Sequence, residues 1–244
     1  MTAELAPLFT MEHVEISYQE AQHHKVIVHD ASFQLFPGEM VALTGQSGTG
    51  KSILAHAMVG LLEQGFTVTN GRIMYKDENI ARFDDKRLQL LRRDEVALLI
   101  QHSLNGLDPI RTVKKQMLET LKQKKIGTKK EKESIIYSLL VKVGFRHPAH
   151  ILNSYPFELS GGMRQRVLIA MILSLRPKIL IADEPTTALD VINRDKVLTL
   201  LKEIQNELGL TILLISHDEK SVKKYANRIL YMEQGGIMNG TARA

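Results

Sequence analysis

Residues 45–52 carry the clearest chemical signal in the chain. They read Gly-Gln-Ser-Gly-Thr-Gly-Lys-Ser and match the pattern G-x-x-x-x-G-K-[ST]. Glycines at this spacing let the backbone turn tightly and aim its N–H groups at phosphate oxygens. The lysine then reaches the β- and γ-phosphates, and the hydroxyl after it holds Mg²⁺. The stretch therefore predicts a nucleoside triphosphate site formed by Gly45, Gln46, Ser47, Gly48, Thr49, Gly50, Lys51 and Ser52.

The segments on either side of this loop have the form that such a site needs. Residues 40–43 are a short apolar run, typical of a strand buried in a parallel sheet. After the loop, Leu54, Ala57, Met58 and Leu61 recur at helical spacing. A strand, a glycine loop and a helix in this order place the phosphate at the positive N-terminal end of the helix. This context favours phosphate binding over an ordinary glycine-rich turn.

Four further polar residues follow short apolar runs that are typical of buried strands. They are Gln101, Asp183, Glu184 and His217. Because ligands of open α/β sheets bind at the carboxyl ends of the strands, we expect these side chains to converge with Lys51. Asp183 is suited to hold Mg²⁺ through a water molecule, and Glu184 is suited to polarise an attacking water.

The elements around these residues predict the fold class. Strands alternate with helices along the chain, which favours an α/β fold with a doubly wound, mainly parallel sheet. Alternating apolar residues near the N-terminus, as in Val14, Ile16 and Tyr18, indicate half-buried strands that form an antiparallel edge. Basic, helix-forming stretches replace strands between residues 102 and 158. We expect one domain over residues 1–244, with a core at about 1–101 and 159–244 and an inserted α-helical subdomain at about 102–158.

Composition narrows the class of protein. The 244 residues are 44% hydrophobic and 24% charged, which is typical of a soluble globular protein. The chain has no cysteine, so disulfides, thiolate metal sites and iron–sulfur clusters are excluded. No apolar run reaches the ~18 residues of a membrane span, and the N-terminus lacks the pattern of a secretory signal. The net charge of +5 is concentrated in a lysine run at residues 122–132, which more often forms a solvated face than a nucleic-acid site.

Residues 159–166 read Leu-Ser-Gly-Gly-Met-Arg-Gln-Arg and open an apolar helix. The paired glycines leave backbone N–H groups free for an anion, although this signal is weak by itself. Taken together with the glycine loop and the strand-end residues, and in this order along the chain, the segment resembles the ATP-binding subunits of ABC transporters. The resemblance extends over nearly the whole chain, from Tyr18 to His217.

The resemblance implies a role for each matching residue. Tyr18 would stack on adenine, Gln101 would sense Mg²⁺ and the γ-phosphate, and His217 would contact the γ-phosphate. The signature residues would close over ATP held by a second ATPase subunit. The implied catalytic residues are Glu184, His217, Gln101 and Lys51; the implied Mg²⁺ ligands are Ser52, Gln101 and Asp183; and the implied signature contacts are Ser160, Gly161, Gly162 and Gln165.

The same resemblance implies partners and a place in the cell. These are a second, identical or different ATPase subunit, two permease subunits and an extracytoplasmic solute-binding protein. The chain would lie peripherally on the cytoplasmic face of the membrane and bind no nucleic acid.

Finer motifs point to a branch of the family. The Tyr-Pro-Phe-Glu of residues 155–158 and the run at 181–191 resemble the importers of dipeptides, oligopeptides and nickel. Residues 107–109 read Leu-Asp-Pro where that branch often has Leu-Asn-Pro, so the contact with the membrane subunit would differ in detail. The lack of a cysteine-bearing extension resembles the shorter nickel-type subunits. We therefore expect import of nickel or a related metal complex, with a di- or oligopeptide as the alternative.

Other classes of ATPase explain the sequence less well. Chromosome-maintenance ATPases carry long heptad arms between the two motifs, which are not present here, and excision-repair ATPases carry cysteine zinc modules. A small-molecule P-loop kinase would need neither the signature nor His217. The histidines His23, His24, His147 and His150 are expected to lie on the surface and not to form a transition-metal site.

Overall fold

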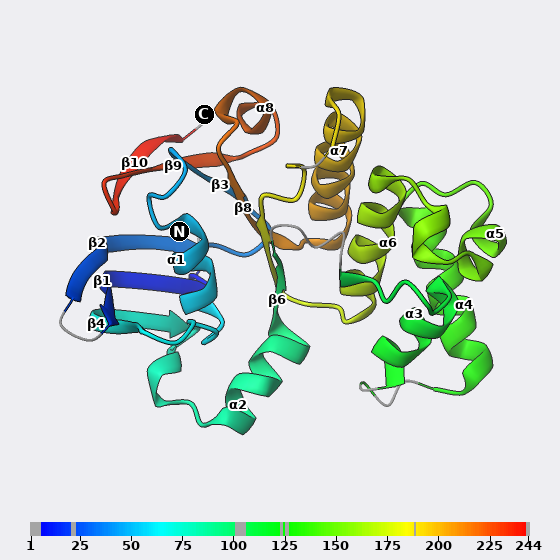
Figure 1. Cartoon of the computed structure of the whole chain (residues 1–244), viewed down its shortest axis with the longest axis horizontal. Helices are drawn as coiled ribbons and strands as arrows, with labels where there is room; N and C mark the ends of the chain where they lie inside the picture. The colour runs from blue at the N-terminus through cyan, green and yellow to red at the C-terminus, as the bar shows by residue number, and fades with distance from the viewer. Residues whose placement is uncertain are drawn as a thin grey trace, which may run out of the picture. The chain divides into compact units, whose positions relative to one another are not determined.

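The computed structural model describes residues 6–20, 23–100, 106–122, 124, 127–187 and 189–242. These residues form two compact units. We call the first the strand-rich unit; it comprises the chain up to residue 98, residues 178–184 and the chain from residue 202. The second is the helical unit, which comprises residues 99–177 and 185–201. Figure 1 shows the elements along the chain.

The larger sheet has six strands in the order β10-β9-β3-β8-β7-β6. Its strand β3 pairs in parallel with β8 and β9, β7 pairs in parallel with β8, and β10 pairs antiparallel with β9. All residues of β3, β7 and β8 are buried, which explains why these strands read as continuous apolar runs. The strands are β3 (Met40–Thr44), β6 (Val96–Leu99), β7 (Ile179–Asp183), β8 (Thr211–Ser216), β9 (Arg228–Glu233) and β10 (Gly236–Ala242).

A second, antiparallel sheet has the order β2-β1-β4-β5. The predicted strand around Tyr18 is β1 (Phe9–Glu20), and it pairs with β2 (His23–Leu35) and β4 (Phe66–Tyr75). The sequence predicts a strand only at residues 72–75. The earlier part of β4 is mostly exposed, and the polar residues and glycine at 69–71 interrupt the alternation that begins at Phe66. The very short β5 (Glu78–Asn79) completes the sheet. The predicted fold class, a mainly parallel sheet with antiparallel strands and helices, is confirmed.

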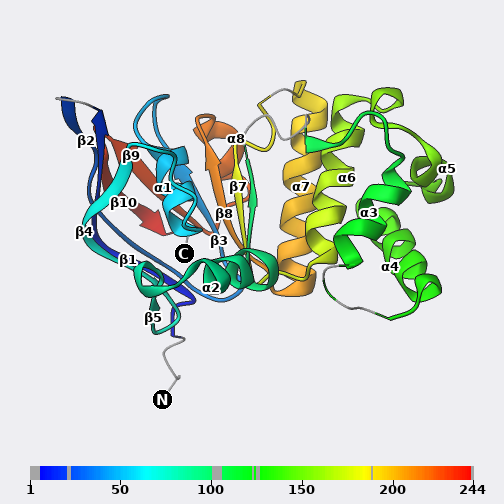
Figure 2. The ribbon, with the colours of Figure 1, turned by 60° about the horizontal axis from the view of Figure 1, so that its bottom comes forward.

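Helix α1 (Lys51–Met58) lies between the two sheets (Figure 2). Leu54 and Met58 are fully buried there, in a core shared with residues of both sheets. The guanidinium of Arg92 donates to the carbonyl oxygen of Val59 at 2.9 Å, just after the last turn of α1, where a cation also suits the negative helix end. Arg92 lies in a π-helical turn (Leu91–Glu95) that the sequence does not predict.

Helices α2 and α8 also belong to the strand-rich unit. Helix α2 (Asp85–Leu90) begins after Asp84, whose carboxylate accepts from the N–H of Arg87 at 2.7 Å. Helix α8 (Glu219–Lys223) is capped in the same way by Asp218.

The helical unit is built from α3 (Val113–Lys122), α4 (Lys129–Lys142), α5 (Pro148–Asn153), α6 (Gly161–Ser174) and the first part of α7 (Val191–Leu208). Met117, Leu121, Ile136 and Leu140 have no exposed surface and form part of its interior. The sequence predicts one apolar face from residues 135, 136, 139, 140 and 143; of these, 136, 140 and 143 are buried and 135 and 139 are half-buried. The division into a core and an inserted subdomain at residues 102–158 stays a prediction.

The turn from β3 into the phosphate loop leaves no room for a side chain. Gly45 has φ +155°, and a Cβ added to it would lie 2.2 Å from the carbonyl oxygen of Met232 in β9. Backbone cannot give way cheaply, so only glycine fits at this position.

We therefore expect Gly45→Ala to lower the free energy of unfolding by about 1–3 kcal/mol and to weaken ATP binding strongly, because the loop must shift. Thermal unfolding and an ATP titration would measure the two effects. The matched control is Gly236→Ala, whose Cβ would sit at ordinary contact distances of 3.7 Å. Unchanged ATP affinity in Gly45→Ala would show that the close approach to β9 does not shape the loop.

Candidate functional site

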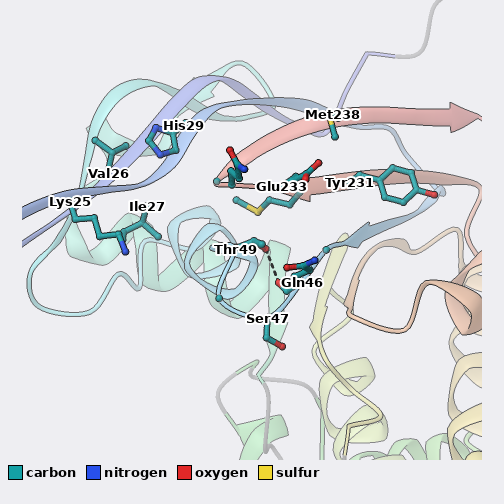
Figure 3. Close-up of a pocket in the computed structure, with 15 residues that line it drawn as sticks. Lys25, Val26, Ile27, His29, Gln46, Ser47, Thr49, Tyr231, Glu233 and Met238 are labelled. Carbon is teal, nitrogen blue, oxygen red and sulfur yellow. Dashed lines mark hydrogen bonds between the residues drawn. The ribbon is translucent and has the colours of Figure 1, made fainter.

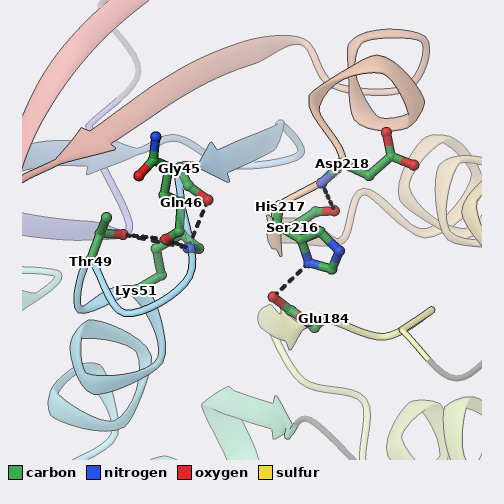
Figure 4. A network of polar contacts seen from close by, with 8 residues as sticks. All are labelled: Gly45, Gln46, Thr49, Lys51, Glu184, Ser216, His217 and Asp218. Carbon is green, nitrogen blue, oxygen red and sulfur yellow. Dashed lines mark hydrogen bonds and ion pairs between the residues drawn. The ribbon is translucent and has the colours of Figure 1, made fainter.

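The phosphate loop is held by its own lysine. The ammonium Nζ of Lys51 donates to the carbonyl oxygens of Gly45 at 2.9 Å and Gln46 at 2.7 Å, and contacts the hydroxyl of Thr49 at 3.4 Å (Figure 4). Lys51 is buried at the first position of α1. Burial lowers the pKa of this ammonium, and the negative charges of Glu184 and Asp183 partly oppose that shift.

Asp183 ends β7 and is 2% exposed. Burial raises the pKa of its carboxyl, and a hydrogen bond from the hydroxyl of Ser52 partly opposes that rise. Its Oδ1 atom is buried and has no hydrogen-bond partner among the described residues. A hydroxyl beside a carboxylate with an unsatisfied oxygen is an oxygen donor set that suits Mg²⁺. Ser52 and Asp183 therefore fit this ion.

Glu184 and His217 are joined directly. The carboxylate Oε1 of Glu184 lies 2.9 Å from the Nδ1 atom of His217, which follows β8 (Figure 4). The Glu184 side chain is 11% exposed, whereas that of His217 is 52% exposed. Glu184 also has φ +47°, in the left-handed region that non-glycine residues rarely adopt. Backbone strain of this kind clusters at functional sites. The backbone N–H of Glu184 donates to the carbonyl oxygen of Ile215 at 3.0 Å.

The register of the sheet explains why these side chains meet. β3, β7 and β8 run parallel, with Thr44 opposite Ser216 and Asp183 opposite Ile215. Their carboxyl ends therefore lie at one edge, which is where open α/β sheets bind ligands. The structure brings together Lys51, Ser52, Asp183, Glu184 and His217 as the sequence predicts, and all five belong to the strand-rich unit.

A pocket of about 570 Å³ flanks the phosphate loop (Figure 3). Its walls come from β2, from the loop itself and from the β9–β10 hairpin. This volume is within the range of small-molecule and cofactor sites. Lys25, His29 and Tyr231 line it, and sequence reasoning missed them because they come from distant strands with no local motif. The full lining is Lys25, Val26, Ile27, His29, Gly45, Gln46, Ser47, Gly48, Thr49, Tyr231, Met232, Glu233, Gln234, Gly235 and Met238.

Tyr18 lies near the end of β1, but it does not line this pocket. Its ring packs against Phe66 with centroids 4.8 Å apart, and its hydroxyl donates to Glu20 at 2.8 Å. This hydrogen bond raises the pKa of the Tyr18 hydroxyl. Stacking of Tyr18 on adenine stays a prediction.

The signature residues lie in the helical unit, at the start of α6. Ser160 is exposed and caps the helix by accepting from the N–H of Met163 at 3.4 Å. A Cβ on Gly162 would lie 3.0 Å from the side-chain oxygen of Asn193, so the glycine permits close packing against the start of α7. Gln165 is 2% exposed and packs inside the unit, with its Nε2 atom unpaired among the described residues. Its side chain is therefore a structural part of α6, and its role in nucleotide binding stays a prediction.

Gln101 lies outside the described residues, so its role as a sensor also stays a prediction. Within the described parts of the chain, no three His, Asp or Glu side chains gather in a way that could hold a metal ion. Nor does any described helix have the length and apolar character needed to cross a membrane.

Comparisons with known proteins place this site in a family. The family model for the ABC transporter matches residues 28–187. The dipeptide transport ATP-binding protein DppD of Bacillus subtilis is 38% identical over 93% of this chain and 68% of its own length. The metal-staphylopine import system ATP-binding protein CntD of Staphylococcus aureus is 35% identical over 97% of this chain and 86% of its own length.

Solved structures agree with these sequence matches. The ATP-binding cassette MJ0796, determined as a dimer in a post-hydrolysis state bound to ADP and Pi, superposes with a TM-score of 0.83 at 27% identity. That match covers 97% of this chain and 99% of the cassette. Some curated relatives are much longer, and the chain spans only 43% of the length of two of them. The family model and the relatives together show that the chain belongs to the ABC transporter family.

Proposed function

We propose that the chain powers an importer by hydrolysing ATP on the cluster of Lys51, Ser52, Asp183, Glu184 and His217. The observation that carries this proposal is the contact between Glu184 and His217 at the strand ends beside the phosphate loop. A structural role alone would not require a carboxylate in a left-handed backbone conformation, paired with a half-exposed histidine.

The side chains of the cluster have different roles in phosphoryl transfer. Lys51 leaves the loop carbonyls and neutralises the β- and γ-phosphates. Glu184 orients the attacking water and accepts its proton, and His217 fixes the Glu184 carboxylate and reaches the γ-phosphate. Held by Ser52 and Asp183, Mg²⁺ would supply charge neutralisation at the β- and γ-phosphate oxygens.

A second cassette completes the site in this proposal. Ser160 and Gly161 of the partner subunit would close over the bound ATP, and the dimeric form of the MJ0796 cassette supports this arrangement. ATP would then favour the closed dimer because it binds that state more tightly. The further partners are two permeases and an extracytoplasmic binding protein, with the chain on the cytoplasmic face of the membrane.

The chemistry can be tested at Glu184. Glu184→Gln keeps the shape of the side chain and a contact with His217, but it removes the base. ATP turnover should fall roughly 10²–10⁴-fold, while ATP binding persists. Glu63→Gln, an exposed change in the same unit, is the control and should leave turnover unchanged. Near-normal turnover in Glu184→Gln would contradict the assigned role.

The contact with a permease is proposed for the segment before α3. There Ile110 is 82% exposed, and Asp108 shapes the loop by accepting from its N–H at 3.0 Å. The side chain of Gln116 fixes the same loop through the backbone N–H and carbonyl oxygen of Asp108. An exposed apolar side chain on a firmly held loop is suited to docking a partner.

Ile110→Asp should therefore leave ATP binding by the isolated chain intact and reduce transport by reconstituted permeases strongly. Leu107 lies in the same loop but is not suited to this test. It is only 3% exposed, so Leu107→Asp would bury a charge and destabilise the fold. Full transport by Ile110→Asp would place the permease contact elsewhere.

The cargo we propose is nickel or a related metal complex, supported by the metal-staphylopine relative. A di- or oligopeptide is the second candidate, and the dipeptide relative favours it. ATPase stimulation in proteoliposomes containing the permeases and the cognate binding protein would separate the two. We expect stimulation by the metal-loaded binding protein that a chelator abolishes. Stimulation by peptides that persists in chelator would establish the second candidate instead.

A further inference from the structure

The helical unit carries a concave basic surface that the ATPase mechanism does not use. It is a cavity of about 440 Å³ formed by one face of α3 and the start of α4. We call it the basic groove; its lining is Arg111, Lys115, Leu118, Glu119, Lys122, Lys129 and Lys132.

The acidic residues near the groove each have a close partner. Glu119, the one carboxylate among the described residues of the lining, pairs at 2.6 Å with Arg111, which also lines the groove. Glu133 pairs with Lys114 outside the groove at 2.9 Å, and this contact lowers the pKa of its carboxyl. Glu131 accepts from the N–H of Thr128 at 2.5 Å in the capping box that begins α4.

Four lysines of the groove are therefore left with a surplus of positive charge. No salt bridge among the described residues involves Lys115, Lys122, Lys129 or Lys132, and the first three are exposed. Helix α3 is fixed from its other side, where Val113, Met117 and Leu121 are buried, and the capping box fixes the first turn of α4. The charges are thus gathered in one place by ordered elements.

We propose that the basic groove binds the phosphate of an anionic phospholipid headgroup at the membrane surface. Ammonium groups on flexible stems attract such headgroups, and half-buried Leu118 with the lysine methylenes offers apolar surface to the glycerol and upper acyl region. None of the described residues that line the groove is aromatic, although single-stranded nucleic acid usually binds to stacking aromatics. The choice of a lipid among phosphate-bearing ligands rests on the proposed transporter function.

The test is sedimentation of the full chain with vesicles of mixed phosphatidylcholine and phosphatidylglycerol, or of phosphatidylcholine alone. The test variant is Lys115→Gln/Lys122→Gln/Lys129→Gln/Lys132→Gln. The control removes four exposed lysines outside the groove, as Lys86→Gln/Lys130→Gln/Lys196→Gln/Lys220→Gln, and so has the same net charge. ATP turnover and thermal unfolding of each protein report on the fold.

We expect binding to the anionic vesicles only, weakened in the test variant by on the order of 10²–10³-fold and much less in the control. Binding should also weaken at high salt, where the screening length is shorter. ATP turnover should be unchanged in both variants.

Three results would overturn the proposal. Equal losses in the two variants would show a non-specific charge effect. Displacement of the vesicles by inorganic phosphate at low concentration would indicate a site for a free anion. Tight, salt-sensitive binding of DNA that the test variant loses would indicate a nucleic-acid surface.

The test also separates this inference from the proposed function. A chain that turns over ATP but does not bind anionic vesicles would contradict the lipid proposal and leave the proposed function intact. Vesicle binding by a chain without ATP turnover would instead leave the groove supported and contradict the proposed ATPase role.

Discussion

Burial of the Lys51 ammonium is the constraint on which the rest of the site depends. A buried charge is costly unless it is hydrogen-bonded, and Lys51 meets this requirement with the carbonyl oxygens of Gly45 and Gln46. The loop brings these carbonyls to the ammonium by turning through left-handed conformations at Gly48 and Gly50. The lysine therefore stabilises the curve of the loop, and a bound phosphate would offer it a stronger, charged acceptor in the same place.

The two carboxylates beside Lys51, Asp183 and Glu184, have different surroundings and therefore different roles. Asp183 is almost fully buried and bonded to Ser52, so its charge is directed toward the loop. Glu184, one residue later, leaves the strand with φ +47° and turns to His217. Because neighbouring residues in a strand point to opposite faces, two adjacent carboxylates can serve one site only if the backbone departs from strand geometry between them. The left-handed backbone conformation of Glu184 provides this departure from strand geometry.

Residues at the ends of buried strands could be predicted from the sequence, because apolar runs locate the strands and parallel pairing aligns their ends. Asp183 and His217 follow from this reasoning, and Lys51 follows from the glycine-loop motif. The residues lining the flanking pocket could not be predicted in this way, since Lys25 and Tyr231 come from strands far apart in the sequence. The π-helical turn at 91–95 was also missed, because no residue pattern separates it from the α-helix before it. Gln165 shows the opposite case. The signature motif predicts a nucleotide contact at this position, whereas the side chain is buried inside the helical unit.

The lysine run shows why net charge is a poor guide to a binding surface. At the level of composition, Lys129–Glu133 is a mixed stretch whose charges nearly cancel. In the structure Glu131 is held by the helix cap and Glu133 by Lys114, so each carboxylate has its closest contact outside the groove lining, although the charge of Glu133 also acts on Lys129. The surplus at the groove therefore depends on where each charge is held as well as on the number of lysines that line it. Since a capping box draws its glutamate toward the backbone, the Glu131 carboxylate is directed to the N–H of Thr128 at the start of α4.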